Sequence, residues 1–147
     1  MSTTHAIPLK DSTLLHTQCL IAGKWQDADN GAVFSVINPA TEKKLCHVAN
    51  SGRAETERAI LAAAEAGLAW RKKSAKDRSN LLRQWFDLMV ANANDLATIM
   101  TYEQGKPLVE AKSEVLYAAS FIEWFAEEGK RLAGDVLQAP QLDKRII

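Results

Sequence analysis

The chain contains little cysteine and no excess of charge of either sign. Cys19 and Cys46 stand far apart among 147 residues, with no CxxC spacing and no paired histidines beside them, so neither a metal site nor a dithiol redox centre is expected. Lys and Arg together number 18, as do Asp and Glu. A net charge of zero gives no electrostatic reason to expect nucleic acid or an anionic membrane as a partner.

Long apolar runs are also missing. Lys10, Asp11 and His16 interrupt the first twenty residues, so no signal peptide is predicted. No later stretch approaches the roughly 18 consecutive apolar residues that span a bilayer. With 47% hydrophobic and 24% charged residues, the composition is that of a globular domain large enough to build a core. We therefore expect a cytoplasmic protein that does not bind membranes.

The first third of the chain carries strand and turn signals. Residues 1–17 show no period and are predicted to form a flexible N-terminal arm. Short apolar segments then alternate with turn residues, namely Asp29-Asn30-Gly31 and Asn38-Pro39-Ala40-Thr41. This pattern predicts strands at 18–22, 33–37 and 44–48, arranged as a small antiparallel meander over residues 18–49.

From Ser51 onwards the apolar residues follow a helical period. Ser51 is expected to cap a helix at 53–71, and a capping signal at Ser74 and Asp77 precedes a second helix at 75–91. The residues of the second helix that follow the helical period are Arg78, Leu81, Leu82, Trp85, Leu88 and Met89. Asn94 is expected to cap a shorter helix that ends at Gly105, and a long helix is expected over 107–132. The fold class of this stretch is therefore α+β, mainly helical with a small antiparallel sheet.

The long helix has two apolar sides, which implies two neighbours. The first side carries Ala111, Val115, Ala118, Ala119, Ile122, Phe125 and Ala126. The second carries Tyr117, Phe121 and Trp124. Two interpretations of these three aromatic residues stay open on periodicity alone: core packing, or the hydrophobic wall of a ligand channel.

No catalytic constellation is present. The chain has no GxSxG elbow and no GxGxxG loop, and Gly105-Lys106-Pro107 is interpreted as a helix-end turn rather than a phosphate loop. Cys19 and Cys46 are interpreted as small buried residues in strands. Glu127 and Glu128 precede Lys130 and Arg131, and a Glu127–Arg131 pair on a solvated charged face is expected. No catalytic, cofactor-binding or metal-binding residue is assigned.

The last residues predict two further strands, at 136–137 and 145–147, joined by Ala139-Pro140. An apolar strand at the very end of a chain is unusual for a natural domain. We therefore expect a truncated protein.

Four motifs in one order and spacing resemble a known family: Ile21-Ala22-Gly23-Lys24-Trp25, Asn38-Pro39-Ala40-Thr41, Glu103-Gln104-Gly105-Lys106-Pro107 and the segment from Ser120 to Arg131. Together they resemble the N-terminal part of NAD(P)-dependent aldehyde dehydrogenases, whose overall fold is α/β. The resemblance covers residues 14–147. Within that family, the residues of the last segment are most like those of bacterial succinate-semialdehyde dehydrogenases. Glutarate-semialdehyde dehydrogenases are similar in this segment.

The resemblance implies a reaction whose machinery this stretch lacks. The family oxidises an aldehyde through a cysteine thiolate, passes a hydride to NAD or NADP, and hydrolyses the intermediate with a glutamate base. None of the surrounding motifs occurs here, so we expect the chain alone to be inactive and not to bind the cofactor. The choice between NAD and NADP stays open.

The resemblance also implies a structural role. Residues 18–134 are expected to form the layer beside the dinucleotide-binding sheet, and residues 135–147 the start of a hairpin that joins subunits into a homo-oligomer. The long helix would border the tunnel for a small aldehyde substrate, with Tyr117, Phe121 and Trp124 as lining candidates. Two other hypotheses stay open: a non-enzymatic interaction fragment that pairs with full-length subunits, and an independent helical binding module.

Overall fold

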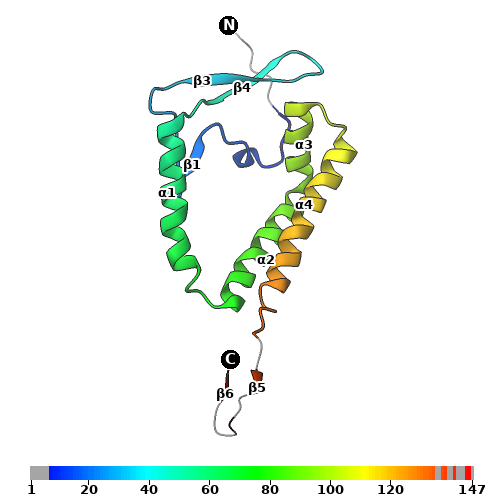
Figure 1. Ribbon diagram of the computed structural model, residues 1–147. Helices are drawn as coiled ribbons and strands as arrows, with labels where there is room; N and C mark the ends of the chain where they lie inside the picture. Colours follow the sequence, from blue (N-terminus) through cyan, green and yellow to red (C-terminus); the bar gives the residue numbers. More distant parts are fainter. Residues whose placement is uncertain (1–6, 135–136, 139–140, 142–144, 147) are drawn as a thin grey trace.

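The computed structural model describes residues 7–134, 137–138, 141 and 145–146. Four helices dominate it, accompanied by three two-stranded antiparallel ribbons. Figure 1 shows α1 standing apart from α2, α3 and α4, with the β3–β4 ribbon across one end of both. The helices are α1 (Arg53–Trp70), α2 (Ala75–Ala91), α3 (Ala93–Gln104) and α4 (Leu108–Glu128).

The first ribbon joins β1 (Cys19–Ile21) to β2 (Lys24–Gln26). Ala22 and Gly23, between them, both adopt left-handed backbone conformations, with φ of 51° and 75°. Two consecutive residues with positive φ make the two-residue turn whose twist suits an antiparallel hairpin. Alanine is not a residue typical of such a turn, so strand β2 was not predicted from the sequence.

The second ribbon joins β3 (Val33–Ile37) to β4 (Lys44–Ala49), with an irregularity between Val36 and Ile37. The predicted single meander is therefore wrong, because β1 pairs with β2 and not with β3. The turn at Gly31 leads from one ribbon into the other instead of closing a hairpin. The predicted fold class, mainly helical with antiparallel strands, is confirmed.

Helix α1 begins where the side chain of Glu55 turns back onto the backbone. Its carboxylate accepts hydrogen bonds from the Gly52 amide at 3.0 Å and from the Asp29 amide at 2.8 Å. Arg58 adds a two-pronged pair with Asp29, both distances being 2.7 Å. Gly52 rather than Ser51 is the N-cap. Polar contacts thus tie the start of α1 to the turn after β2.

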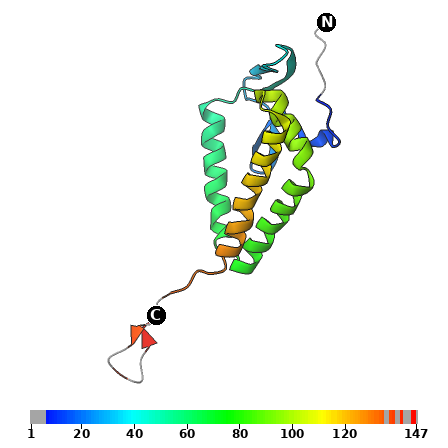
Figure 2. The same ribbon diagram turned by 90° about the vertical axis from the view of Figure 1, so that its right-hand side faces the viewer.

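Helices α2, α3 and α4 share a core of small residues. Alanines 93, 97 and 111 pack with Val115, and Ala97 and Ala111 have no solvent-exposed surface. Residues of this size let helix backbones approach closely. Helix α4 runs antiparallel to α2 and α3 and lies along both, as the two ribbon views agree (Figures 1 and 2).

Two further predicted helix boundaries change. Asn92, not Asn94, is the N-cap of α3, so α2 and α3 are separated by a single residue. Helix α4 ends at Glu128 rather than near residue 132, with Gly129 as its C-cap. The predicted start at Ser74 is confirmed, since its hydroxyl accepts the Asp77 amide at 3.1 Å.

The described part of the N-terminal arm carries one turn of 3-10 helix, Ser12–Leu14. The Asp95 carboxylate in the first turn of α3 accepts the backbone amides of Lys10 at 3.1 Å and Asp11 at 2.8 Å. These two bonds place the arm beside the N-terminus of α3. Towards the other end of the chain, β5 (Leu137–Gln138) pairs antiparallel with β6 (Arg145–Ile146).

Among the described residues, none of the helices is both long and apolar enough to cross a membrane.

Candidate functional site: exposed apolar residues on two helices

The second apolar side of α4 faces away from the core. Tyr117, Phe121 and Trp124 follow one line along the helix at i, i+4 and i+7, and are 66%, 48% and 63% exposed. The rings of Tyr117 and Phe121 meet edge to face with centroids 4.8 Å apart. The residues that α4 buries lie on its other side, at positions 111, 115, 119 and 126. Within the described structure these three rings are therefore surface residues, not core.

Helix α2 presents a similar line, whose residues belong to the periodic set predicted for this helix. Leu81, Trp85 and Leu88 have the same i, i+4, i+7 spacing and are 43%, 54% and 63% exposed. Residues of α2 that are less exposed, such as Leu82 and Met89, stand on the adjacent side. The signal was present as periodicity, but periodicity does not separate a side that meets a neighbour from one that meets solvent.

An ion pair joins α2 to α4, since Arg83 and Glu123 meet at 2.6 Å. Successive residues of a helix are about 100° apart, so the aromatic line of α4 lies roughly opposite the residues that this helix buries. Tyr117, Phe121 and Trp124 are called here the apolar face.

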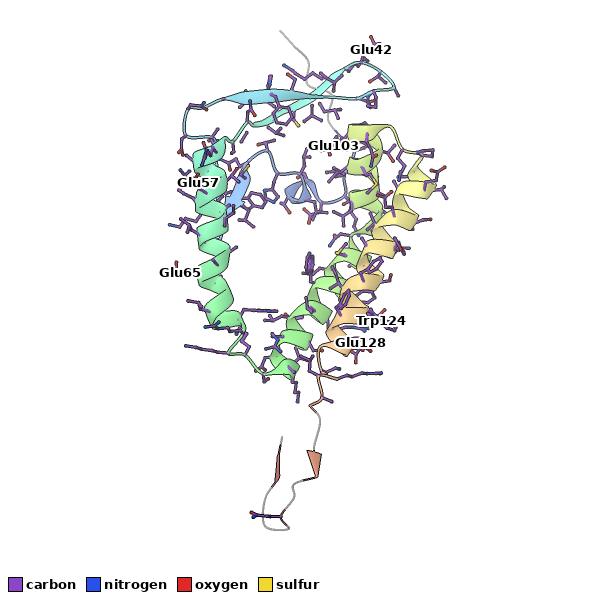
Figure 3. The ribbon with its side chains drawn as sticks, in the orientation of Figure 1. Glu42, Glu57, Glu65, Glu103, Trp124 and Glu128 are labelled. Atoms are coloured by element: carbon purple, nitrogen blue, oxygen red, sulfur yellow. The ribbon has the colours of Figure 1, made fainter. Side chains whose placement is uncertain are left out.

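Charged residues border the last two turns of α4. An open depression of about 690 Å³ there is lined by Phe121, Trp124 and Phe125 together with charged side chains. Figure 3 shows Trp124 and Glu128 on this lower part of α4. Glu127 pairs with Lys130 at 2.6 Å and Glu128 approaches Arg131 at 3.6 Å.

The hydrogen bond from Lys130 holds the pKa of Glu127 below its usual range. The predicted charged face is therefore present, but the predicted Glu127–Arg131 pair is replaced by pairs three residues apart. Carboxylates committed to neighbouring cations at the surface are poorly suited to act as a catalytic acid and base.

Two of the four motifs meet as one structural joint. Asn38 is buried, and its side-chain oxygen accepts the amides of Ala40 at 2.9 Å and Thr41 at 3.3 Å. Pro39 then lies against Gly105, where an added Cβ would come within 2.9 Å of the proline Cγ. Gly105 is the left-handed C-cap of α3, with φ of 78°. The interpretation of Gly105-Lys106-Pro107 as a helix-end turn is thus confirmed.

The cysteines do not have the environment of a nucleophile. Burial raises the pKa of the Cys46 thiol, and the nearby carboxylate of Glu103 raises it further. Desolvation also raises the pKa of Glu103 itself. The Cys19 sulfur accepts a hydrogen bond from Ser51 at 3.3 Å. Both cysteines are free and partly buried. The raised pKa of Cys46 keeps its thiol protonated, and a protonated thiol reacts slowly.

Over the described ranges, no cluster of three or more His, Cys, Asp or Glu side chains has an arrangement that holds a metal ion. Among the described residues, the candidate site that the geometry favours is the apolar face. It can bind, cover or orient, but it carries no group that performs covalent chemistry.

Comparison with known proteins gives this surface its context. Residues 25–147 match the family model described as "Aldehyde dehydrogenase family". Over 139 residues, which are 95% of this chain, the sequence is 56% identical to the glutarate-semialdehyde dehydrogenase of Pseudomonas aeruginosa. Over the same length it is 55% identical to the NADP(+) succinate-semialdehyde dehydrogenase GabD of Escherichia coli.

The fold has close relatives among solved structures. The succinate-semialdehyde dehydrogenase of Burkholderia pseudomallei superposes with a TM-score of 0.87 at 58% identity, over 94% of this chain. An aldehyde dehydrogenase from Brucella melitensis superposes with a TM-score of 0.88 at 54% identity. The chain spans about 29% of the length of these relatives and of the curated ones.

Proposed function

Because the chain belongs to the aldehyde dehydrogenase family, we propose that it is the N-terminal portion of an enzyme that oxidises succinate or glutarate semialdehyde with NAD or NADP. One observation carries the proposal: identity of 55–56% to enzymes of these two substrate classes over 95% of the chain. The rest of the relatives' length is needed for the chemistry, so the 147 residues alone are proposed to be inactive.

Within such an enzyme this stretch is proposed to act as scaffold and as one wall of the aldehyde tunnel. Tyr117, Phe121 and Trp124 support this role, because they form a continuous apolar line that the core of the chain does not use. An apolar wall suits the methylene chain of a small semialdehyde and excludes water beside it. The β5–β6 pair is proposed to begin the hairpin that joins subunits into a homo-oligomer.

The test is a chimera in which this chain replaces the matching segment of Escherichia coli GabD. We expect the chimera to oxidise succinate semialdehyde, followed as NADPH absorbance, and the 147-residue chain to give no signal above a boiled control. Turnover by the chain alone would contradict the proposed division of labour. A chimera that assembles but oxidises neither succinate nor glutarate semialdehyde would contradict the proposed function.

The tunnel role has its own test in the chimera. Phe121→Ala is expected to raise KM for succinate semialdehyde several-fold, because a wall of the proposed tunnel is lost. Val109→Ala removes an equally apolar but 79% exposed side chain from the same helix, off the apolar face, and is the matched control. Equal KM values for the two variants would remove Phe121 from the tunnel.

A second candidate is a non-enzymatic fragment that pairs with full-length subunits. The short β5–β6 pair favours it, since a two-stranded ribbon leaves strand edges open for pairing. Co-expression with full-length GabD distinguishes the two. Stable incorporation of this chain into GabD oligomers supports pairing, and its absence from purified GabD counts against it.

A further inference from the structure

Three polar side chains meet outside the apolar face, on the β3–β4 ribbon at one end of the molecule (Figure 1). The side-chain amine of Lys44 lies 3.0 Å from Nε2 of His47, and Nδ1 of the same ring lies 3.3 Å from the Ser35 hydroxyl. We propose that Lys44 is a modification site at which small aliphatic aldehydes form a reversible imine, with His47 as the acid–base group. The proposal stands apart from the proposed function, because imine formation needs no cofactor.

A β-bulge brings these side chains onto one face of the ribbon. Ser35 pairs with His47, and two residues further along β3, Ile37 pairs with Lys44. The same step covers three residues of β4, so Leu45 is an extra residue, and it is buried. Side chains alternate between the two faces of a strand, and residues three apart would normally point in opposite directions. The bulge therefore re-aims Lys44 to the face of His47 and Ser35.

The two contacts of His47 indicate which ring nitrogen carries the proton. A lysine ammonium has donors only, so Nε2 accepts from Lys44, and the single proton of the ring is then on Nδ1. The Ser35 hydroxyl accepts that proton and holds the ring with Nε2 towards the amine. A basic nitrogen held next to an amine is the arrangement that general acid–base catalysis requires.

Two other lysines have contacts of the opposite kind. Lys106 and Lys130 each contact a glutamate carboxylate. A negative partner stabilises the ammonium form of an amine, and an ammonium nitrogen has no lone pair with which to attack a carbonyl carbon. The contact of Lys44 is with a nitrogen base instead, which can take the proton that the attack requires it to lose.

The site is accessible and has an apolar side chain beside it. Ser35 and His47 are exposed, and Lys44 is partly exposed. Ile37, which pairs with Lys44 across the ribbon, is 44% exposed. A short alkyl chain can lie against Ile37 while the carbonyl carbon meets the amine, and this contact removes apolar surface from water. Small aliphatic aldehydes therefore suit the site.

The reaction balances without a further reactant. His47 takes a proton from the ammonium, the free amine adds to the carbonyl carbon, and the π electrons of the C=O bond move onto oxygen. The imidazolium returns its proton to that oxygen, which gives a carbinolamine. His47 then moves a second proton from nitrogen to the hydroxyl, which leaves as water while the nitrogen lone pair forms the C=N bond. The products are a protonated imine and water, and nothing is oxidised or reduced.

The experiment treats the 147-residue chain with propanal and quenches samples at intervals with borohydride, which reduces the imine to a stable secondary amine. Tandem mass spectrometry of a proteolytic digest then gives the initial rate at each lysine. Lys43 is the internal control, because it is adjacent in the chain and exposed. We expect Lys44 to react at least about tenfold faster than Lys43, since a positioned acid–base group contributes roughly 100-fold or more. Equal rates at the two lysines would overturn the proposal.

Variants separate the role of each side chain, with circular dichroism as the check on folding. His47→Gln keeps an acceptor for Lys44 but cannot carry a proton, so the rate at Lys44 should fall to that of Lys43. A tenfold preference that survives this change would contradict the acid–base role of His47. Ser35→Ala should lower the rate at Lys44 by a smaller factor, and an unchanged rate would remove Ser35 as the group that orients the ring. Lys43→Arg, the matched control, should leave the rate at Lys44 unchanged, and a fall as large as that of His47→Gln would contradict the proposed site.

Discussion

The helices of the two halves of the molecule are held by different kinds of contact. In α2, α3 and α4, small apolar side chains such as Ala97 and Ala111 allow close helix packing. In the other half, Ile21, Ala28 and Leu45 are buried outside α1, and α1 itself is tied by polar contacts of Glu55 and Arg58 with the turn at Asp29. One half has a helical core of its own, whereas α1 buries no apolar side chain at all.

This difference shows which helices pack against a neighbour within the described structure and which one does not. The only buried residue of α1 is Glu55, although its sequence offers a side of small residues that the helical period groups together. Such a side is suited to a close neighbour, and the described part of the chain supplies none along most of α1. The comparison therefore predicts large effects of substitution in the helical core and small ones along α1.

The largest effect is expected from placing a charge in the core of the helical half. Ala111→Asp puts a carboxylate where the side chain has no exposed surface, and should cost about 4 kcal/mol or more of unfolding free energy. The matched variant is Ala64→Asp, at an exposed position of α1, with an effect below about 0.5 kcal/mol. Urea unfolding followed by circular dichroism measures both. Similar losses would erase the distinction between the halves.

The joint between Pro39 and Gly105 links the halves and comes next. Gly105→Ala requires a left-handed alanine and brings its Cβ within 2.9 Å of the proline Cγ, so a loss of about 1–3 kcal/mol is expected. Gly67→Ala, inside α1 with no atom near its added Cβ, should instead stabilise by about 0.5–1 kcal/mol. Thermal unfolding gives both signs, and a matching loss at Gly67 would contradict the reasoning.

A pH titration sharpens the polar side of the comparison. Backbone hydrogen bonds, above all the one from the Asp29 amide, hold the pKa of Glu55 below its ordinary value of 4.5. A carboxylate with a lowered pKa in the folded state contributes stability above its unfolded pKa and loses it as the pH falls through the folded one. The urea midpoint should therefore decline below about pH 4.5 more steeply in the wild type than in Glu55→Gln. Parallel profiles of the two proteins would remove Glu55 as the source.

The smallest effect is expected at the ion pair between α2 and α4. Arg83 and Glu123 are 47% and 41% exposed at their side chains, so solvent and salt screen the attraction. Arg83→Ala should cost about 0.2–1 kcal/mol, and less at high salt. Chemical unfolding at two salt concentrations measures this. A loss of unfolding free energy as large as that of Ala111→Asp would mean that polar contacts also stabilise the helical half.

Local features of the fold were readable from the sequence. Ser74 and Asp77 mark the start of α2, and Gly105 marks the end of α3, because caps satisfy backbone groups within a few residues of themselves. The β1–β2 hairpin was missed for an equally local reason. Its turn places Ala22 in a left-handed conformation, which an alanine in the sequence does not indicate.

The candidate site was only partly readable. Tyr117, Phe121 and Trp124 were identified as a side of α4, with core and channel both open. The helical period of α2 groups Leu81 and Trp85 with the other apolar residues of this helix. Only the structure shows that these two side chains stay exposed. The helical period reports which residues share a side, and the packing of other elements decides which of those sides are covered.

The sequence by itself determined the four helices, most of their ends, and the family to which its motifs belong, because these depend on short-range backbone contacts and on residues in a fixed order. The tertiary structure alone decided that the motifs at Pro39 and Gly105 meet and that apolar residues on α2 and α4 stay exposed. Those outcomes depend on residues far apart in the chain, and no local pattern encodes which distant surface a side chain will meet.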